Sequence, residues 1–192
     1  MTENAPSFPS SLRKKYGSKL ANEVDSFPNY FKDASEIIGK PSAIFFAESE
    51  IDIIEIITDL VLSLERLKKL EVDPERKLAF CGPGVITIDL MKQAEKHNLF
   101  YPPDPASYDE STLGGNVAEC AGGLHCKKYG VTKDYIIGLR GITAGGEIIK
   151  TGIYSEGDLF NLSGIMIGSE GMLIAITEIA VRLIDRPQPG LT

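Results

Sequence analysis

The chain has 192 residues, of which 43% are hydrophobic and 24% charged, a balance typical of soluble globular proteins and unlike disordered, collagen-like or coiled-coil chains. Its formal net charge of −7, with basic residues scattered among acidic ones, argues against a nucleic-acid partner. No apolar run approaches the roughly 20 residues that cross a bilayer, so we expect no membrane span. Three cysteines without a short pairing pattern suit a reducing, cytoplasmic location.

The first third of the chain predicts a helix and then an α/β unit. Apolar residues recur every four positions over residues 12–25, which is the pattern of an amphipathic helix. A buried strand follows at 43–46, a helix at 49–58 and a second strand at 60–64. No glycine or proline separates that helix from the second strand, so the junction at Thr58–Leu60 is unusual for a helix-to-strand connection.

The rest of the chain predicts short helices between antiparallel strands. In chain order we first expect a hairpin over 69–81, a helix over 87–97, a stiff proline-rich loop at 101–105 and a short helix over 117–120. A hairpin over 135–150 and a short helix from Asp158 follow. The chain then has a loop at 168–171, a long strand over 172–183 and an extended tail from Pro187. These elements indicate the α+β class, with mixed and antiparallel pairing.

Glycine is distributed unevenly along the chain. Of 19 glycines only Gly17 and Gly39 precede Cys81. Because glycine lets the backbone approach a ligand closely, we expect any ligand-binding loops in the second half. Three glycine-centred segments stand out there: TLGGNVAE from Thr112, AGGLHCKKYGVT from Ala121 and IGSEGMLIAIT from Ile167.

Such segments suit a large anionic cofactor. Gly114 and Gly115 lack side chains, so their N–H groups are expected to face phosphate oxygens at the start of a helix, with Thr112 and Asn116 hydrogen-bonding at the rim. The alternative is that the glycines merely serve tight turns. Spacing alone does not identify the cofactor.

Familiar catalytic motifs are absent from the sequence. There is no Gly-x-Ser-x-Gly elbow, no phosphate-binding Gly-Lys-Ser/Thr loop and no His-Glu-x-x-His helix. Cys120, His125 and Cys126 lie close together, yet their spacing is not that of a zinc site. We therefore expect no metal.

Four runs carry a specific resemblance: YPPDPAS from Tyr101, STLGGNVAECAGG from Ser111, KYGVTKD from Lys128 and IGSEGMLIAITEI from Ile167. They closely resemble the FAD-linked oxidase family, in particular the branch that contains the D-type glycolate oxidase subunit and the D-lactate and D-2-hydroxyglutarate dehydrogenases. The resemblance implies a FAD-binding domain of the vanillyl-alcohol-oxidase/PCMH type, with two α/β subdomains and mixed and antiparallel sheets. That domain would span 31–186, after a helical extension at 1–30 and before a tail at 187–192.

The resemblance also implies a site and a reaction. In this family a 2-hydroxy acid gives a hydride to the flavin, whose redox chemistry the protein orients. Carried onto this chain, the expected FAD-contacting residues are Pro103, Thr112, Gly114, Gly115, Asn116, Gly122, Gly123, Gly130, Val131, Gly168, Glu170, Gly171 and Ile176. No catalytic base is assigned, because neither histidine matches the family's catalytic position.

The chain departs from the family pattern in three respects. The glycine-rich loop of the Pro-Arg-Gly-x-Gly-Thr type is missing, so the first subdomain is expected to be shortened near 59–60. Cys120 stands where the family has Asn, and Ile174 where it has Gly, so the Ile174 side chain is expected to intrude on the cofactor. In the family the pattern continues into a substrate-binding cap domain, which we do not expect within these 192 residues.

Two functional hypotheses follow from the resemblance and these departures. In the first, the chain binds FAD, a separate partner subunit completes the site, and the assembly oxidises a small 2-hydroxy acid. In the second, the chain is a non-catalytic remnant or scaffold with weak or no FAD binding.

Overall fold

The computed structural model describes residues 14, 16–21, 24–27, 44–55, 61–156 and 162–188. The chain divides into two compact units, residues 1–66 and 67–192. The predicted junction at Thr58–Leu60 and the first residues of the helix predicted from Asp158 lie outside the described residues. None of the helices in the described ranges is long and apolar enough to cross a membrane.

The first unit contains a small mixed sheet. Its strands are β1 (Leu20–Ala21), β2 (Ile44–Phe46) and β3 (Val61–Ser63), and its helix is α2 (Glu50–Glu55). β2 pairs antiparallel with β1 and parallel with β3. Parallel neighbours need a crossover connection, which α2 begins. The predicted strand–helix–strand order is therefore confirmed in the described residues.

The helix predicted over residues 12–25 is wrong in its central part. A single 3₁₀ turn occupies Gly17–Lys19, and Leu20 pairs with Phe45 as part of β1. Gly17 has a φ of +50°, a left-handed conformation that interrupts an α-helix. The apolar repeat instead buries Leu20 in the sheet.

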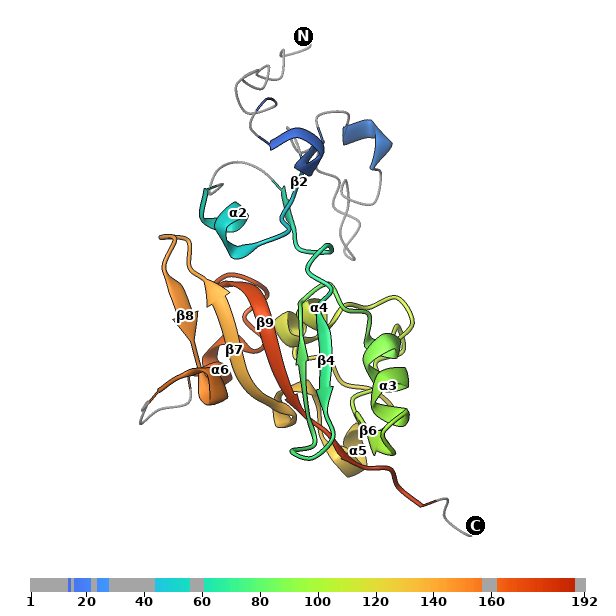
Figure 1. Ribbon diagram of the computed structural model, residues 1–192. Coiled ribbons are helices and arrows are strands. Elements are labelled where there is room, and N and C mark those ends of the chain that lie inside the picture. The colour runs from blue at the N-terminus through green and yellow to red at the C-terminus, as the bar shows by residue number, and fades with distance from the viewer. Residues whose placement is uncertain are drawn as a thin grey trace. The chain divides into compact units, whose positions relative to one another are not determined.

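The second unit is built on a five-stranded antiparallel sheet, seen in Figure 1 with β8, β7 and β9 side by side. The strand order is β4 (Leu70–Asp73), β5 (Leu78–Cys81), β9 (Ala175–Arg182), β7 (Ile136–Ile142) and β8 (Ile148–Lys150). Both predicted hairpins, β4–β5 and β7–β8, are confirmed. The predicted long strand is β9, at the centre of the sheet.

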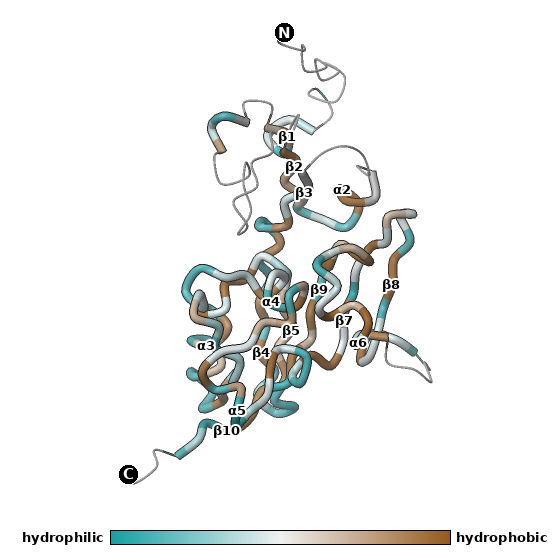
Figure 2. The backbone as a smooth tube through the Cα atoms, turned by 180° about the vertical axis from the view of Figure 1, so that it is seen from behind, coloured by the Kyte–Doolittle hydropathy of each residue, from teal (hydrophilic) through white to brown (hydrophobic). Residues whose placement is uncertain are grey.

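Helices pack on this sheet to form one core. They are α3 (Thr87–Glu95), α4 (Leu113–Glu119), α5 (Cys126–Tyr129) and α6 (Ser163–Met166), with 3₁₀ turns at Thr132–Asp134 and Gly152–Tyr154. Fully buried side chains of Leu139, Ile179 and Val181 meet those of Leu90 and Val117 in this core. Figure 2 shows the matching pattern, with hydrophobic colouring along most of β9.

Two features of the second unit were not predicted from the sequence. The helix α5 was not expected, and the strands β6 (Leu99–Phe100) and β10 (Ile184–Asp185) form an antiparallel pair. The chain after β9 therefore returns to the end of α3 as a strand before it reaches Pro187, where the extended tail was predicted.

Candidate functional site

The candidate residues gather around α4. This helix begins four residues earlier than predicted, because Thr112 caps it: its Oγ1 accepts the Gly115 N–H at 3.1 Å. Gly114 and Gly115 therefore lie in the first turn of the helix and not in a loop before it. The helix ends at Cys120, which adopts a left-handed conformation.

The N-terminal end of α4 is already hydrogen-bonded within the protein. Gly114 donates its N–H to the Pro83 carbonyl at 2.9 Å, and Gly115 donates to Thr112. A Cβ on Gly114 would come within 2.6 Å of the Pro83 Cβ. The expectation of free N–H groups facing phosphate is therefore not met in this structure, and Gly114 serves close packing.

Asn116 lies inside the fold and not at a rim. Its side chain is 3% exposed and donates from Nδ2 to Thr87 Oγ1 at 2.7 Å. Thr87 Oγ1 also lies 3.0 Å from the Ser111 carbonyl oxygen. Asn116 thus joins α4 to the start of α3, and its expected rim position is corrected.

The 168–171 segment, which contains three exposed candidate residues, is hydrogen-bonded to the C-terminal half of α4. Gly168 donates its N–H to the Val117 carbonyl at 2.9 Å, and Glu170 donates to Ala118 at 3.0 Å. Gly168, Glu170 and Gly171 are exposed, and all three have positive φ. Main-chain bonds thus hold this segment against α4 while its backbone faces solvent.

The 121–131 loop reaches the same end of α4. The Ala121 carbonyl accepts both the N–H of Thr132, at 3.0 Å, and its Oγ1, at 2.7 Å. A Cβ on Gly122 would lie 3.1 Å from Val131 Cγ1, so the two ends of the loop touch. Gly130, with a φ of +89°, leaves no room for a Cβ beside the Asp134 carboxylate.

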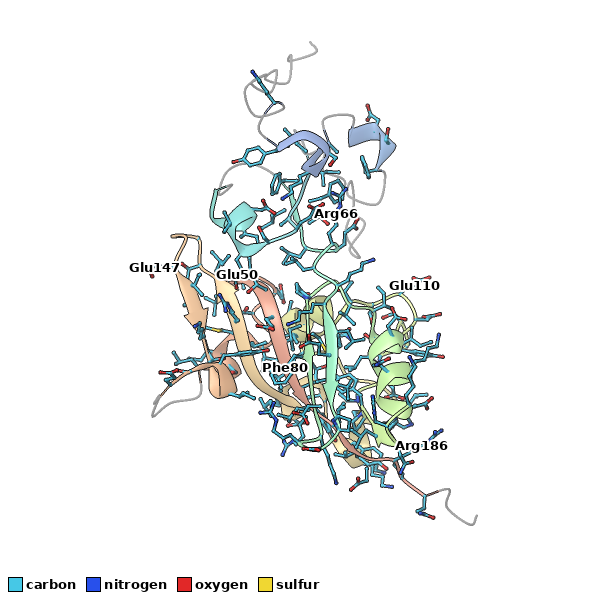
Figure 3. All side chains as sticks on the ribbon, in the orientation of Figure 1. Glu50, Arg66, Phe80, Glu110, Glu147 and Arg186 are labelled. Atoms are coloured by element: carbon cyan, nitrogen blue, oxygen red, sulfur yellow. The ribbon has the colours of Figure 1, made fainter. Side chains whose placement is uncertain are left out.

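The proline-rich loop lies against Gly123. Pro103 is buried, and a Cβ on Gly123 would overlap the Asp104 carbonyl oxygen. The Asp104 carboxylate accepts the His125 N–H at 2.9 Å and lies 2.9 Å from His125 Nδ1. Sequence reasoning missed this contact, since no spacing rule links residues 21 positions apart. Farther along the loop Glu110 is exposed, and Figure 3 shows its side chain directed outward.

Ile174 and Ile176 belong to the core. Their side chains are 4% and 5% exposed, and Ile174 Cδ1 packs 2.8 Å from where a Cβ on Gly141 would lie. Ile174 therefore fills the space above a glycine of β7. The expectation that its side chain projects toward a ligand is corrected.

One phenol and one thiol near α4, those of Tyr101 and Cys81, are buried and protonated. Burial raises the pKa of the Tyr101 phenol and of the Cys81 thiol. Both groups stay protonated around neutral pH.

The class of the protein follows from comparison with known families. A model of the FAD binding domain matches residues 49–152, more than half of the chain. The chain therefore belongs to the FAD-binding domain family. This range includes α4, the proline-rich loop and the 121–131 loop, and it excludes the 168–171 segment.

Among individual proteins, the chain is 46% identical over 136 residues to "Glycolate oxidase subunit GlcD" of Bacillus subtilis, a match that covers 69% of this chain. It is 37% identical over 129 residues, 66% of the chain, to "D-lactate dehydrogenase" of Archaeoglobus fulgidus. In both comparisons the chain spans 29% of the relative's length.

Solved structures show the fold. Alkyldihydroxyacetonephosphate synthase superposes with a TM-score of 0.80 at 21% identity, covering 98% of this chain and 43% of its own. p-Cresol methylhydroxylase superposes with a TM-score of 0.76 at 17% identity, covering 93% and 43%. The expected α+β fold of the vanillyl-alcohol-oxidase/PCMH type is thus confirmed.

Proposed function

We propose that the chain is the FAD-binding part of a flavin-dependent oxidoreductase that acts on small 2-hydroxy acids. The main support for this proposal is the family match over residues 49–152, a range that contains nine of the thirteen predicted cofactor-binding residues. The names of the relatives, glycolate oxidase and D-lactate dehydrogenase, support the substrate class. Bound FAD would supply the acceptor for a hydride.

From their exposure we infer that some candidates touch the cofactor and that others support them. Exposed or half-exposed backbone at the two ends of α4 suits contact with a flat ring system or a diphosphate, because glycine lets these groups approach the main chain. These positions are Thr112, Gly115, Gly122, Gly123, Gly130, Val131, Gly168, Glu170 and Gly171, whereas Gly114 packs against Pro83 and supports the site. Pro103, Asn116 and Ile176 are buried, so we assign them to shaping the site.

The catalytic base is not among the residues we assign. We propose that a partner subunit completes the substrate site in the cytoplasm, consistent with the word "subunit" in the glycolate oxidase name. We also propose that the FAD-binding domain extends over residues 31–186 and is shortened near 59–60.

The first test is flavin content. The protein is purified without added flavin, its visible absorbance is recorded, and it is then titrated with FAD. We expect little bound flavin after purification but saturable binding on titration. Gly122→Val should weaken this binding about tenfold or more, because its side chain would cover exposed backbone next to Val131.

Gly145→Val is the matched control, since Gly145 is exposed in the β7–β8 turn, where a Cβ meets only Thr143 Oγ1 at 3.6 Å. It should leave FAD binding unchanged. Circular dichroism of both variants shows whether each is folded. Equal FAD affinity in the two folded variants would contradict the proposed binding surface.

The second candidate function is a scaffold with weak or no FAD binding. One observation favours it: the N–H groups of Gly114 and Gly115 are occupied by protein acceptors. Saturating FAD that produces no shift in flavin absorbance or fluorescence would support the scaffold. Bleaching of bound flavin by glycolate or D-lactate would show turnover by the chain alone, which we do not expect.

A further inference from the structure

Asp104 holds His125 at two points. One carboxylate oxygen accepts the His125 main-chain N–H, and the other lies 2.9 Å from ring Nδ1. An ionised carboxylate only accepts hydrogen bonds, so Nδ1 must carry the proton. When the ring is neutral, it is thereby held in the tautomer whose Nε2 has a free lone pair.

Aromatic neighbours fix the ring plane as well. Phe100 meets the imidazole edge-to-face with ring centroids 5.9 Å apart, and Tyr129 does so at 6.2 Å. The main chain of Tyr129 is also held, because its carbonyl accepts the Tyr135 hydroxyl at 2.7 Å. The orientation of Nε2 is thus set by a carboxylate on one side and by ring packing on two others.

The His125 side chain is half-exposed and Nε2 has no hydrogen-bond partner among the described residues. The His125 side chain is 48% exposed, whereas Asp104 is 14% exposed. The ring follows Gly123 by two residues, in the turn closed by the Cys126 N–H and the Gly123 carbonyl at 3.1 Å.

We propose that His125 Nε2 is a preset hydrogen-bond acceptor for a ligand hydroxyl or N–H group, and that Asp104 is its positioning residue. The inference rests on the proposed function, since the ligand is taken to bind beside Gly122 and Gly123. Its source is either the hydroxyl-rich cofactor or the hydroxyl of a 2-hydroxy acid. The chemistry recognised is the same in both cases.

The first experiment needs no ligand. Long-range ¹H–¹⁵N NMR of the imidazoles reports the tautomer of each neutral histidine in the flavin-free protein. His97, the only other histidine, is exposed and has no carboxylate partner in the described part of the chain, so it is an internal reference. We expect the Nδ1–H form at His125 and the ordinary Nε2–H form at His97.

Variants of Asp104 separate positioning from folding. In Asp104→Asn the amide can donate to Nδ1, which should move His125 to the Nε2–H form. Asp109→Asn, an exposed change in the same loop region, should leave the tautomer as it is. A wild-type His125 in the Nε2–H form, or one that Asp104→Asn leaves unchanged, overturns the proposal.

Binding of two ligands then identifies the donor. His125→Asn keeps a group that can donate to Asp104 but removes the Nε2 acceptor, and His97→Asn is the control. Loss of one hydrogen bond should weaken binding about fivefold. A fivefold loss of FAD affinity assigns the cofactor as donor. An unchanged FAD affinity, with about fivefold more D-lactate or glycolate needed to perturb bound flavin, assigns the acid.

These experiments distinguish a failure of the His125 proposal from a failure of the proposed FAD-binding function. If wild type binds FAD and His125→Asn changes neither affinity, the acceptor proposal is overturned while the proposed function stands. If wild type binds no FAD at all, the proposed function fails and the ligand assignment fails with it. The NMR result, obtained without flavin, then still decides whether Asp104 sets the tautomer.

Discussion

Gly114 and Pro83 form a close main-chain contact at the start of α4. The Gly114 N–H donates to the Pro83 carbonyl at 2.9 Å, and a Cβ on Gly114 would lie 2.6 Å from the Pro83 Cβ. Real Cβ atoms do not approach other atoms so closely. The contact fastens α4 to the turn between β5 and α3, and it explains why a glycine stands at 114.

Gly114→Ala should therefore lower the free energy of unfolding by about 1–3 kcal/mol, the usual cost of forcing a methyl group into a packed site. Gly115→Ala is the matched control. There a Cβ meets only Thr112 Oγ1 at 3.3 Å, and alanine is the better helix former by up to about 1 kcal/mol. Urea denaturation of both variants checks the prediction, which equal stability of the two would refute.

The buried hydrogen bond from Asn116 to Thr87 should make substitutions at these two positions energetically coupled. Asn116→Ala and Thr87→Val should each cost about 1–3 kcal/mol, because each leaves a buried partner without its hydrogen bond. The double variant should lose about 1 kcal/mol less than the sum. Denaturant unfolding of all four proteins measures this difference, and strict additivity would show that the bond contributes nothing.

Ile174→Ala should destabilise the second unit by about 2–4 kcal/mol, because it leaves a cavity above Gly141 in the core. It should not tighten FAD binding, since the side chain is buried and does not project outward. Met172→Ala, at a position that is 79% exposed, should change stability by less than about 0.5 kcal/mol. Urea unfolding and FAD titration test both statements, and tighter FAD binding by Ile174→Ala would contradict the second.

Asp52 should make the first unit sensitive to acid. Burial alone would raise the pKa of its carboxyl, but hydrogen bonds from Lys19, at 2.8 and 2.9 Å, and from the Glu48 N–H outweigh burial and lower it. The stabilisation is therefore complete above the ordinary aspartate pKa of about 4 and is lost as the pH falls through the lower folded-state value.

Asp52→Asn should cost about 1–3 kcal/mol at neutral pH and flatten this acid dependence. Hydrogen-exchange protection of the β2 amides, measured from neutral pH into acid, reports the stability of this unit. Glu48→Gln, at a half-exposed position 3.6 Å from Lys19, should have a much smaller effect. An acid dependence that survives in Asp52→Asn would assign it to another group.

Local patterns predicted most of the second unit. The β4–β5 and β7–β8 hairpins and the helix α3 follow from alternation, turn residues and helical periodicity between near neighbours. The helix predicted over residues 12–25 is wrong because the left-handed Gly17 and the pairing of Leu20 with Phe45 outweigh the four-residue repeat of apolar side chains. The sequence predicts the start of α4 too late because two glycines suggest a loop, whereas the Thr112 cap and the Pro83 contact make both glycines helical.

The sequence by itself determined the class of the protein: ordered motifs from Tyr101 to the end of β9 identify the FAD-binding domain family, because the order of several specific runs rarely arises by chance. Only the tertiary structure decided what each residue does. In the folded chain Asn116 and Ile174 are buried, the Gly114 N–H donates to the Pro83 carbonyl, and the Asp104 carboxylate contacts His125. Those outcomes depend on how distant segments return to one another around α4, and no local pattern records that.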